Sequence, residues 1–277
     1  MSVLIAIPVY NERRHVERVL ERVRRHHPHI LCVDDGSTDG TGELLATRKD
    51  VNLIRHEQNM GYGRSLIDAF GYAERHGFDW VITMDCDEQH EPERIPDFLR
   101  LIATDAWDLI SGSRYLAEPD ATGPVDLPPA DRRSINAAVT AVINVLFGWK
   151  LTDAFCGFKA HRTSATTALQ LDETGYAFPL QLWPRAAAAK LRITETPVRL
   201  IYNDPNRRFG GDLDDAFIRL RHYLDVLHRE LHRQPERALA PESCAACFCE
   251  PGQVGQGRRV AGADVPGRAA KSIPARA

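Results

Sequence analysis

Short apolar segments alternate with segments of helical periodicity through the first half of the chain. The apolar segments are rich in β-branched residues, as strands are, and cover residues 3–10, 29–35, 51–56, 79–85 and 107–113. Apolar residues between them recur with the spacing of an amphipathic helix, at Val16, Val19, Leu20 and Val23 and again at Ile95, Phe98, Leu99 and Ile102. This alternation predicts an α/β fold, with a mostly parallel sheet and helices on both of its faces.

Polar side chains follow three of these apolar segments at the point where each one ends. They are Tyr10-Asn11-Glu12, Asp34-Asp35-Gly36-Ser37 and Asp85-Cys86-Asp87. In sheets of this kind, ligands bind beyond the carboxyl ends of the strands. We therefore expect the three acidic turns to meet on one rim of the sheet and to form a ligand site there.

The next part of the chain predicts a loop and a long helix. Residues 117–131 are rich in Pro, Asp and Gly, which is typical of a mobile loop. Residues 132–149 are apolar almost all round, apart from one polar stripe formed by Asn136, Thr140 and Asn144. Such a helix is typical of a buried core, and contact with lipid is the alternative.

A last helix is predicted from Asp212 to Arg233, after a strand within residues 192–203. Its apolar seam consists of Phe217, Leu220, Leu224, Leu227 and Leu231, and the remainder of its surface carries Arg219, Arg221, Arg229 and Arg233. Packing on the domain is the ordinary role of such a helix. A basic amphipathic helix also suits an anionic membrane surface.

Composition indicates one folded domain and a tail. The chain has 277 residues, 43% of them hydrophobic, and we expect a single domain over residues 1–233. Residues 234–277 are low in aliphatic side chains and rich in Pro, Gly, Ala and Arg, which predicts a disordered tail. Three cysteines of the tail, Cys244, Cys247 and Cys249, are a weak candidate for structural zinc because no histidine lies near them.

Charge and hydropathy limit the partners and the location. A formal net charge of −3 gives no argument for nucleic acid as a partner. The N-terminal apolar run lacks the basic region of a signal sequence, and no apolar stretch reaches the length of a membrane span. We therefore expect a cytoplasmic protein, with a peripheral position at the inner face of the membrane as the alternative.

The stretch from Asp85 to Gln89 is the clearest candidate for metal binding. Asp85, Asp87 and Gln89 stand at every second position, so they share one face if the chain stays extended past Met84. Oxygen ligands of this kind suit a hard divalent cation such as Mg²⁺ or Mn²⁺, which keeps coordination sites for substrate phosphates. An acidic turn without a ligand is the alternative, because Asp is common in turns.

The familiar glycine-rich phosphate-binding motifs are absent from the sequence. Neither the dinucleotide fingerprint after the first strand nor a Gly-x-x-x-x-Gly-Lys-Ser/Thr motif occurs. Gly61 and Gly63, in NMGYGRSL, predict either a flexible turn or a close approach of the backbone to a phosphate or sugar. The doubled Asp34-Asp35 favours hydrogen bonds to a base or to a ribose hydroxyl.

Four motifs together resemble the family 2 glycosyltransferases, which use nucleotide sugars and have the GT-A (Rossmann-like) fold. They are IPVYNE, VDDGSTDGT, MDCDEQHEP and GSRY, in that order between residues 3 and 116. Farther on, TDAFCGFKAHR and ITETPVRLIYNDPNRRFGG are similar to the dolichyl-phosphate mannosyltransferase branch. The resemblance implies that residues 1–233 are a catalytic domain.

The resemblance also implies roles for individual residues. Contacts to the nucleotide fall on Pro8, Tyr10, Glu12, Asp35 and Asp85. The metal ligands are Asp85, Asp87 and Gln89, with the metal bridging the diphosphate, and Asp87 and Arg114 then belong to the catalytic centre. The cations that meet the leaving diphosphate and an acceptor phosphate are Arg114, Arg133, Lys159 and Arg208.

The chemistry of such a site depends on the acceptor. A divalent ion and basic side chains can stabilise the departing nucleoside diphosphate without a proton donor. A lipid phosphate is already ionised, whereas a hydroxyl acceptor must give its proton to a carboxylate, for which Asp153 is the candidate. The branch usually carries Arg-x-x-Gly-x-Ser-Lys, and RRFGGDLDD here lacks the Ser-Lys.

The sequence therefore predicts a metal-dependent inverting glycosyltransferase. It would move a hexose of the mannose or glucose type from a GDP- or UDP-sugar to a polyprenyl phosphate, with peripheral membrane contact. The same donor chemistry with a hydroxyl acceptor on a glycan, a lipid or a small molecule is the first alternative. A catalytically silent nucleotide-sugar-binding module is the remote alternative.

Overall fold

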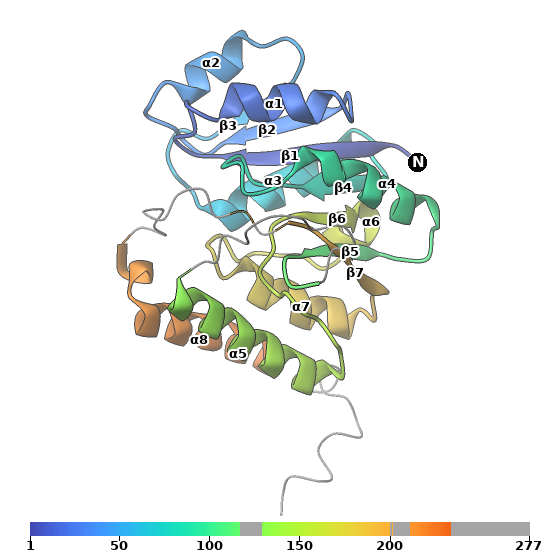
Figure 1. Ribbon diagram of the computed structural model, residues 1–277, viewed down its shortest axis with the longest axis vertical. Helices are drawn as coiled ribbons and strands as arrows, with labels where there is room; N and C mark the ends of the chain where they lie inside the picture. Colours follow the sequence, from blue (N-terminus) through green and yellow to red (C-terminus); the bar gives the residue numbers. More distant parts are fainter. Residues whose placement is uncertain (117–128, 200, 202–210, 234–277) are drawn as a thin grey trace, which may run out of the picture. The chain divides into compact units, whose positions relative to one another are not determined.

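A single mixed sheet organises the part of the chain that the computed structural model describes, residues 1–116, 129–199, 201 and 211–233. Its strand order is β3-β2-β1-β4-β6-β5-β7 (Figure 1). The strands are β1 (Val3–Val9), β2 (Ile30–Asp34), β3 (Asn52–Arg55), β4 (Trp80–Thr83), β5 (Leu109–Ser113), β6 (Lys159–Arg162) and β7 (Ile193–Pro197). Pairings are parallel except those of β6, which is antiparallel to β4 and β5. The predicted α/β fold with a mostly parallel sheet is confirmed.

Helices cover both faces of the sheet, as predicted. They are α1 (Val16–Arg24), α2 (Thr41–Thr47), α3 (Tyr62–Arg75), α4 (Ile95–Ala103), α5 (Ala130–Phe147), α6 (Thr163–Thr167), α7 (Phe178–Ala188) and α8 (Ala216–Arg233), with short 3₁₀ turns η1 (Pro92–Arg94) and η2 (Gly211–Asp214). Successive side chains of a strand point to opposite faces, so β1 contributes to two cores. Leu4 and Ala6 belong to the core with α3, α5, α7 and α8, whereas Ile5 and Ile7 belong to the core with α1, α2 and α4.

The five strands predicted in the first half are β1 to β5, and the two amphipathic helices are α1 and α4. The sequence reading did not anticipate β6, α6 or α7. The chain also does not stay extended beyond β4, because the strand ends at Thr83 and Glu88 has a left-handed φ of 61°. A turn therefore carries Asp87 and Gln89.

The polar stripe of α5 faces the interior of the domain. Asn136 and Thr140 are buried, and the Asn144 side chain forms a pair of 2.8 Å hydrogen bonds with the backbone of Leu151. Thr140 accepts a hydrogen bond from the backbone N–H of Ala154. The prediction of a buried helix is thus correct for this side, and the stripe fixes the loop at residues 151–154.

Several predictions fall on residues that the structure does not describe. These are most of the 117–131 loop, the end of the strand predicted within 192–203, Arg208, and the 234–277 tail with its three cysteines. In the described ranges, every helix is too short or too polar to cross a membrane.

Candidate active site

A pocket of about 670 Å³ opens beyond the carboxyl ends of β1, β2 and β4, where the acidic turns were expected to meet. It has an acidic half, which the turns after these strands supply. The predicted site residues in this half are Pro8, Tyr10, Glu12, Asp35, Asp85, Asp87 and Gln89, and Arg114 also lines the pocket. The structure therefore brings eight of the predicted residues together.

The two aspartates after β2 differ in their surroundings: one is buried in the fold and the other lines the pocket. Asp34 is fully buried, accepts a hydrogen bond from the backbone N–H of Ser37 and pairs with Arg55. Asp35 lines the pocket instead. Gly36 has a φ of +71°, and a Cβ there would lie 2.4 Å from the backbone carbon of Gln58, so only glycine lets these two turns touch.

The turn after β4 has the donor chemistry of a site for a hard cation. Asp85, Asp87 and Gln89 all line the pocket. Nε2 of Gln89 is buried without a hydrogen-bond partner, and a turn of the amide would place its oxygen there. In the described ranges no three His, Cys, Asp and Glu side chains gather around a metal position, so a cation would rely on two carboxylates, the amide and substrate phosphates. These residues fit Mg²⁺ or Mn²⁺.

Three neighbours surround Asp85. The Tyr62 hydroxyl donates to the carboxylate Oδ1 of Asp85 at 3.1 Å, and His90 Nδ1 accepts a hydrogen bond from the backbone N–H of Asp85 at 3.0 Å. A Cβ on Gly157 would lie 2.8 Å from both Asp85 and the Tyr62 hydroxyl. Burial, reinforced by the charge of Asp85, raises the pKa of Tyr62 well above its ordinary value, so the phenol remains a donor. The sequence predicts a turn or a close backbone approach for NMGYGRSL, but it gives no role to Tyr62 within that segment.

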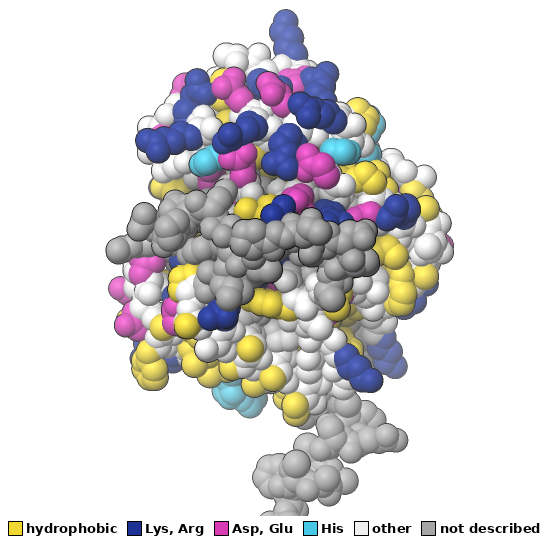
Figure 2. All heavy atoms as spheres, in the orientation of Figure 1, with side chains coloured by type: hydrophobic (Ala, Val, Ile, Leu, Met, Phe, Trp, Pro, Cys, Tyr) yellow, Lys and Arg dark blue, Asp and Glu magenta, His cyan; other side chains and the backbone are white. Residues whose placement is uncertain are grey.

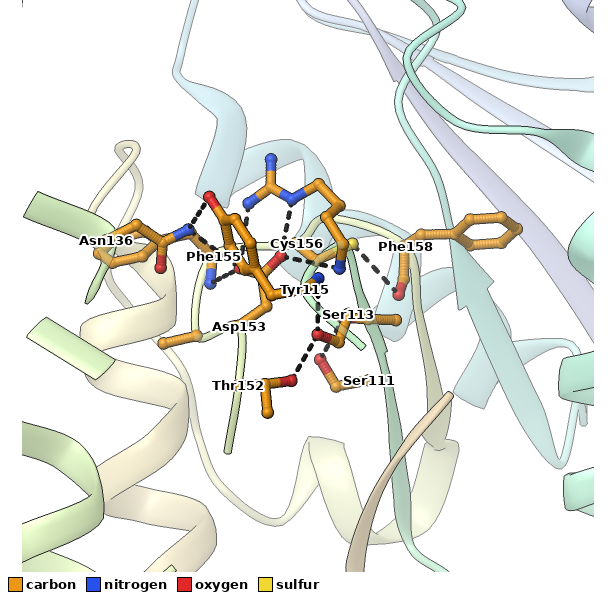
Figure 3. A network of polar contacts seen from close by, with 12 residues as sticks. Ser111, Ser113, Tyr115, Asn136, Thr152, Asp153, Phe155, Cys156 and Phe158 are labelled. Carbon is orange, nitrogen blue, oxygen red and sulfur yellow. Dashed lines mark hydrogen bonds and ion pairs between the residues drawn. The ribbon is translucent and has the colours of Figure 1, made fainter. Parts of the chain in front are cut away.

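Asp153 holds Arg114 and does not face the pocket as a base would. Its carboxylate is fully buried and accepts two hydrogen bonds from the Arg114 guanidinium. It also accepts one from Asn136 (Figure 3). Asp153 is not among the residues that line the pocket. Burial would raise the pKa of Asp153, but the positive charge and hydrogen bonds of Arg114 lower it to about 2. A carboxylate with that pKa is a poor proton acceptor, so these contacts favour an anchoring role over the predicted base.

Two of the other predicted cations do not reach the pocket lining. Lys159 is buried, and its ammonium donates to Ser111 Oγ at 2.7 Å and to the carbonyl of Cys156. Burial lowers the pKa of Lys159. Arg133 is exposed at the start of α5, whereas its neighbour Arg132 lines the pocket. Among the described arginines, the pocket lining contains the predicted Arg114 together with Arg132 and a third arginine from α8.

That third arginine is Arg219, which the sequence reading placed on the solvent side of its helix. The placement was wrong: Arg219 is 2% exposed and lines the pocket. It donates to Asp131 and to the carbonyl of Leu213, both at 2.7 Å. Because Asp131 is 88 positions away, no local pattern could have revealed this burial.

An aromatic half completes the pocket, and the sequence reading missed nearly all of it. Its side chains come from the segment after β5, from α5, from the loops before β6 and α7, from the start of α7, from residue 201 after β7, and from α8. They are Tyr115, Arg132, Ile135, Asn136, Phe155, Tyr176, Pro179, Ile201, Arg219 and Tyr223. Among these described lining residues there are two arginines and no carboxylate.

Comparison with known families decides the assignment. Residues 4–166 match the model of the family described as glycosyl transferase family 2. The chain belongs to this family. It is an enzyme of the glycosyltransferase class, with the GT-A type of fold that its motifs implied.

Three curated proteins are similar to this chain in sequence. The chain is 31% identical to an undecaprenyl-phosphate mannosyltransferase of Micrococcus luteus, over 79% of this chain and 92% of that protein. It is 32% identical to a polyprenol monophosphomannose synthase of Mycolicibacterium smegmatis, over 78% and 84%. It is 28% identical to a UDP-N-acetylglucosamine–dolichyl-phosphate N-acetylglucosaminyltransferase of Methanococcus voltae, over 78% and 92%.

Proposed function

We propose that this glycosyltransferase moves a hexose, of the mannose or glucose type, from a nucleotide sugar to a polyprenyl phosphate, with inversion at the anomeric carbon. The observation that carries the proposal is the division of the pocket. Its carboxylates lie in the acidic half, whereas the described lining of the aromatic half combines Arg132 and Arg219 with apolar and aromatic side chains. A polyprenyl phosphate has an anionic head and an apolar tail. Arginines suit the head, and the apolar and aromatic side chains of the aromatic half suit the tail.

The absence of a suitable base supports the same acceptor. A hydroxyl acceptor must lose a proton as it attacks, whereas a phosphate oxygen is already ionised. Asp153, the carboxylate predicted to serve as base, is buried behind Arg114 with a pKa of about 2. The described residues of the aromatic half therefore suit a phosphate nucleophile better than a hydroxyl.

The acidic half would hold the nucleotide and its diphosphate. Asp35 accepts hydrogen bonds from the base or the ribose, and Arg114, held in place by Asp153, faces the departing diphosphate. A Mg²⁺ or Mn²⁺ ion held by Asp85, Asp87 and Gln89 would neutralise the charge that develops on this leaving group. Two of the three relatives are named for mannose and one for a UDP-sugar, which supports a nucleotide-linked hexose as donor. The donor would be a GDP- or UDP-sugar.

An enzyme with a lipid acceptor must contact the membrane, and one surface of the domain has exposed apolar side chains suited to that contact. Val145 and Val142 of α5 are 70% and 38% exposed, and Phe217 and Leu224 of α8 are 73% and 41% exposed. Figure 2 shows hydrophobic side chains on the lower part of this face, where α5 and α8 lie. Amphipathic helices with exposed apolar side chains and flanking arginines bind the membrane interface. We infer peripheral attachment through this α5–α8 surface.

The proposal can be tested with a two-phase transfer assay. Purified protein is incubated with Mn²⁺, a polyprenyl phosphate and radiolabelled GDP-mannose or UDP-glucose, and label is counted in the organic phase. We expect label in the organic phase, and we expect both EDTA and the Asp87→Asn substitution to abolish it. Label that persists in EDTA would contradict the proposed metal dependence. Hydrolysis of the donor without label in the organic phase would contradict polyprenyl phosphate as the acceptor.

A further inference from the structure

His56 connects the predicted nucleotide contact Asp35 to helix α3. Its Nδ1 lies 2.6 Å from Oδ1 of Asp35, and its Nε2 lies 2.9 Å from Oδ2 of Asp68. The Asp68 oxygen also accepts from Nε of Arg64 at 2.8 Å. The side chain of His56 is only 7% exposed, and His56 does not line the pocket. Neither the motifs nor the proposed function gives this residue a role.

The same Asp35 carboxylate also holds the turn at residues 60–61. Its Oδ1 accepts from the backbone N–H of Met60 at 2.8 Å, and its Oδ2 accepts from the backbone N–H of Gly61 at 2.9 Å. A carboxylate offers about four lone pairs, two on each oxygen. Oδ1 is therefore saturated by His56 and Met60, and the remaining acceptor capacity of Asp35 lies on Oδ2.

The consequence concerns how a nucleotide can use Asp35. The carboxylate lines the pocket, so an incoming hydroxyl or ring N–H can reach it only at the oxygen that still accepts. We propose that His56 is a positioning residue, which occupies Oδ1 of Asp35 so that Oδ2 alone accepts one hydrogen bond from the nucleotide. This inference rests on the proposed function, because it takes the acidic half as the nucleotide site.

The two nitrogens of His56 can be tested separately. Asparagine at position 56 retains a donor near the position of Nδ1 and loses the contact to Asp68. Glutamine retains a donor near the position of Nε2 and loses the contact to Asp35. The matched pair His56→Asn and His56→Gln therefore distinguishes the bond to Asp35 from general support of α3.

The experiment measures binding of UDP and of GDP, each with MnCl₂, by isothermal titration calorimetry, together with the Tm of every variant. Loss of the contact from His56 frees the Asp35 carboxylate to turn away from the nucleotide, and the hydrogen bond then lost to this charged group is worth about tenfold in affinity. His56→Gln and His56→Ala are expected to raise the Kd of the bound nucleotide by about tenfold, and His56→Asn is expected to leave it within about threefold of wild type. His76→Asn, at an exposed histidine outside the pocket lining, is the control for the substitution itself.

The outcomes separate this inference from the proposed function. Equal affinities of His56→Asn and His56→Gln, or affinities that follow Tm alone, would overturn the positioning role. Asp35→Ala is expected to weaken binding by at least as much as His56→Ala. If Asp35→Ala binds like wild type, or if wild type binds neither nucleotide, the nucleotide site itself is misassigned and the inference fails with it.

Discussion

Arg114 and Asp153 form a two-point ion pair behind the pocket, with Nε 2.7 Å from Oδ2 and Nη2 3.0 Å from Oδ1. The carboxylate is fully buried, whereas the arginine lines the pocket. Asn136 and the backbone N–H of Phe155 donate to the same carboxylate. The residue predicted as a base thus holds a cation that lines the pocket, the cation that our proposal assigns to the departing diphosphate.

This pair gives a prediction for stability. Asp153→Asn leaves the Arg114 guanidinium, whose side chain is 21% exposed, without its fully buried counter-charge. Breaking such a largely buried pair costs about 3 kcal/mol in the free energy of unfolding. Urea denaturation measures it. The matched control is Glu93→Gln, which breaks the pair of Arg22 with a half-exposed carboxylate and should cost less than about 1 kcal/mol. Equal losses of unfolding free energy in the two variants would show that the Arg114–Asp153 pair stabilises the fold no more than an exposed ion pair does.

A second prediction concerns the acid sensitivity of the fold. Burial, with a smaller contribution from Lys159, lowers the pKa of His161 to about 3, below its ordinary value of 6.5. Between these values the unfolded state binds the proton and the folded state does not, so stability falls as the pH drops below about 6.5. The slope from this one residue approaches about 1.4 kcal/mol per pH unit.

The measurement compares the free energies of unfolding at about pH 7 and about pH 5.5, on either side of the ordinary histidine pKa. His161→Leu should reduce the loss between them by about 1 kcal/mol, because the buried imidazole is gone. His76→Gln, at an exposed histidine, should leave the loss unchanged. A His161→Leu variant as acid-sensitive as wild type would exclude this source of the pH dependence.

Tyr62 predicts a change in metal requirement. Tyr62→Phe removes the hydroxyl that donates to Asp85 and keeps the ring, which stacks with Tyr176 at 5.9 Å. The half-saturating Mn²⁺ concentration for nucleotide binding should rise by about tenfold, as expected for the loss of a partner that orients a ligand. Tyr72→Phe on the same helix is the control. An unchanged Mn²⁺ requirement in Tyr62→Phe would mean that the hydroxyl does not tune Asp85.

The α5–α8 surface predicts an effect on membrane binding alone. Val145→Asp and Phe217→Asp place charges where we expect the lipid interface, so both should reduce co-flotation with anionic vesicles by about tenfold or more. Ala46→Asp adds the same charge to an exposed position of α2. Binding of nucleotide should be unchanged in all three variants. Vesicle binding that survives Val145→Asp and Phe217→Asp would place the membrane contact elsewhere.

Local patterns predicted the elements that carry their own signal. β1, β2 and β4 are continuous apolar runs, and the acidic turns after them lie where the general geometry of parallel sheets puts them. The strand β6 was missed because its four residues, Lys159 to Arg162, are mostly polar. It becomes a strand through pairing with β4 on one side and β5 on the other, which only the folded chain brings together.

The difference between local patterns and long-range contacts also explains which site residues could be predicted from the sequence. Glu12, Asp35 and Asp87 belong to short motifs, and the structure gathers them in one pocket. The roles of Asp153 and Arg219 depend on partners 39 and 88 positions away, Arg114 and Asp131. On a sequence, Arg219 is one of several arginines on an amphipathic helix, and nothing local separates the buried one from the rest.

The most direct test of the central claim compares two acceptors that differ only in the phosphate. The protein is given a labelled nucleotide hexose, Mn²⁺ and either a polyprenyl phosphate or the corresponding free polyprenol, and label in the organic phase is measured. We predict transfer to the phosphate and none above background to the alcohol, because the described lining of the aromatic half offers arginines and no base. Equal or preferred transfer to the alcohol would contradict this account.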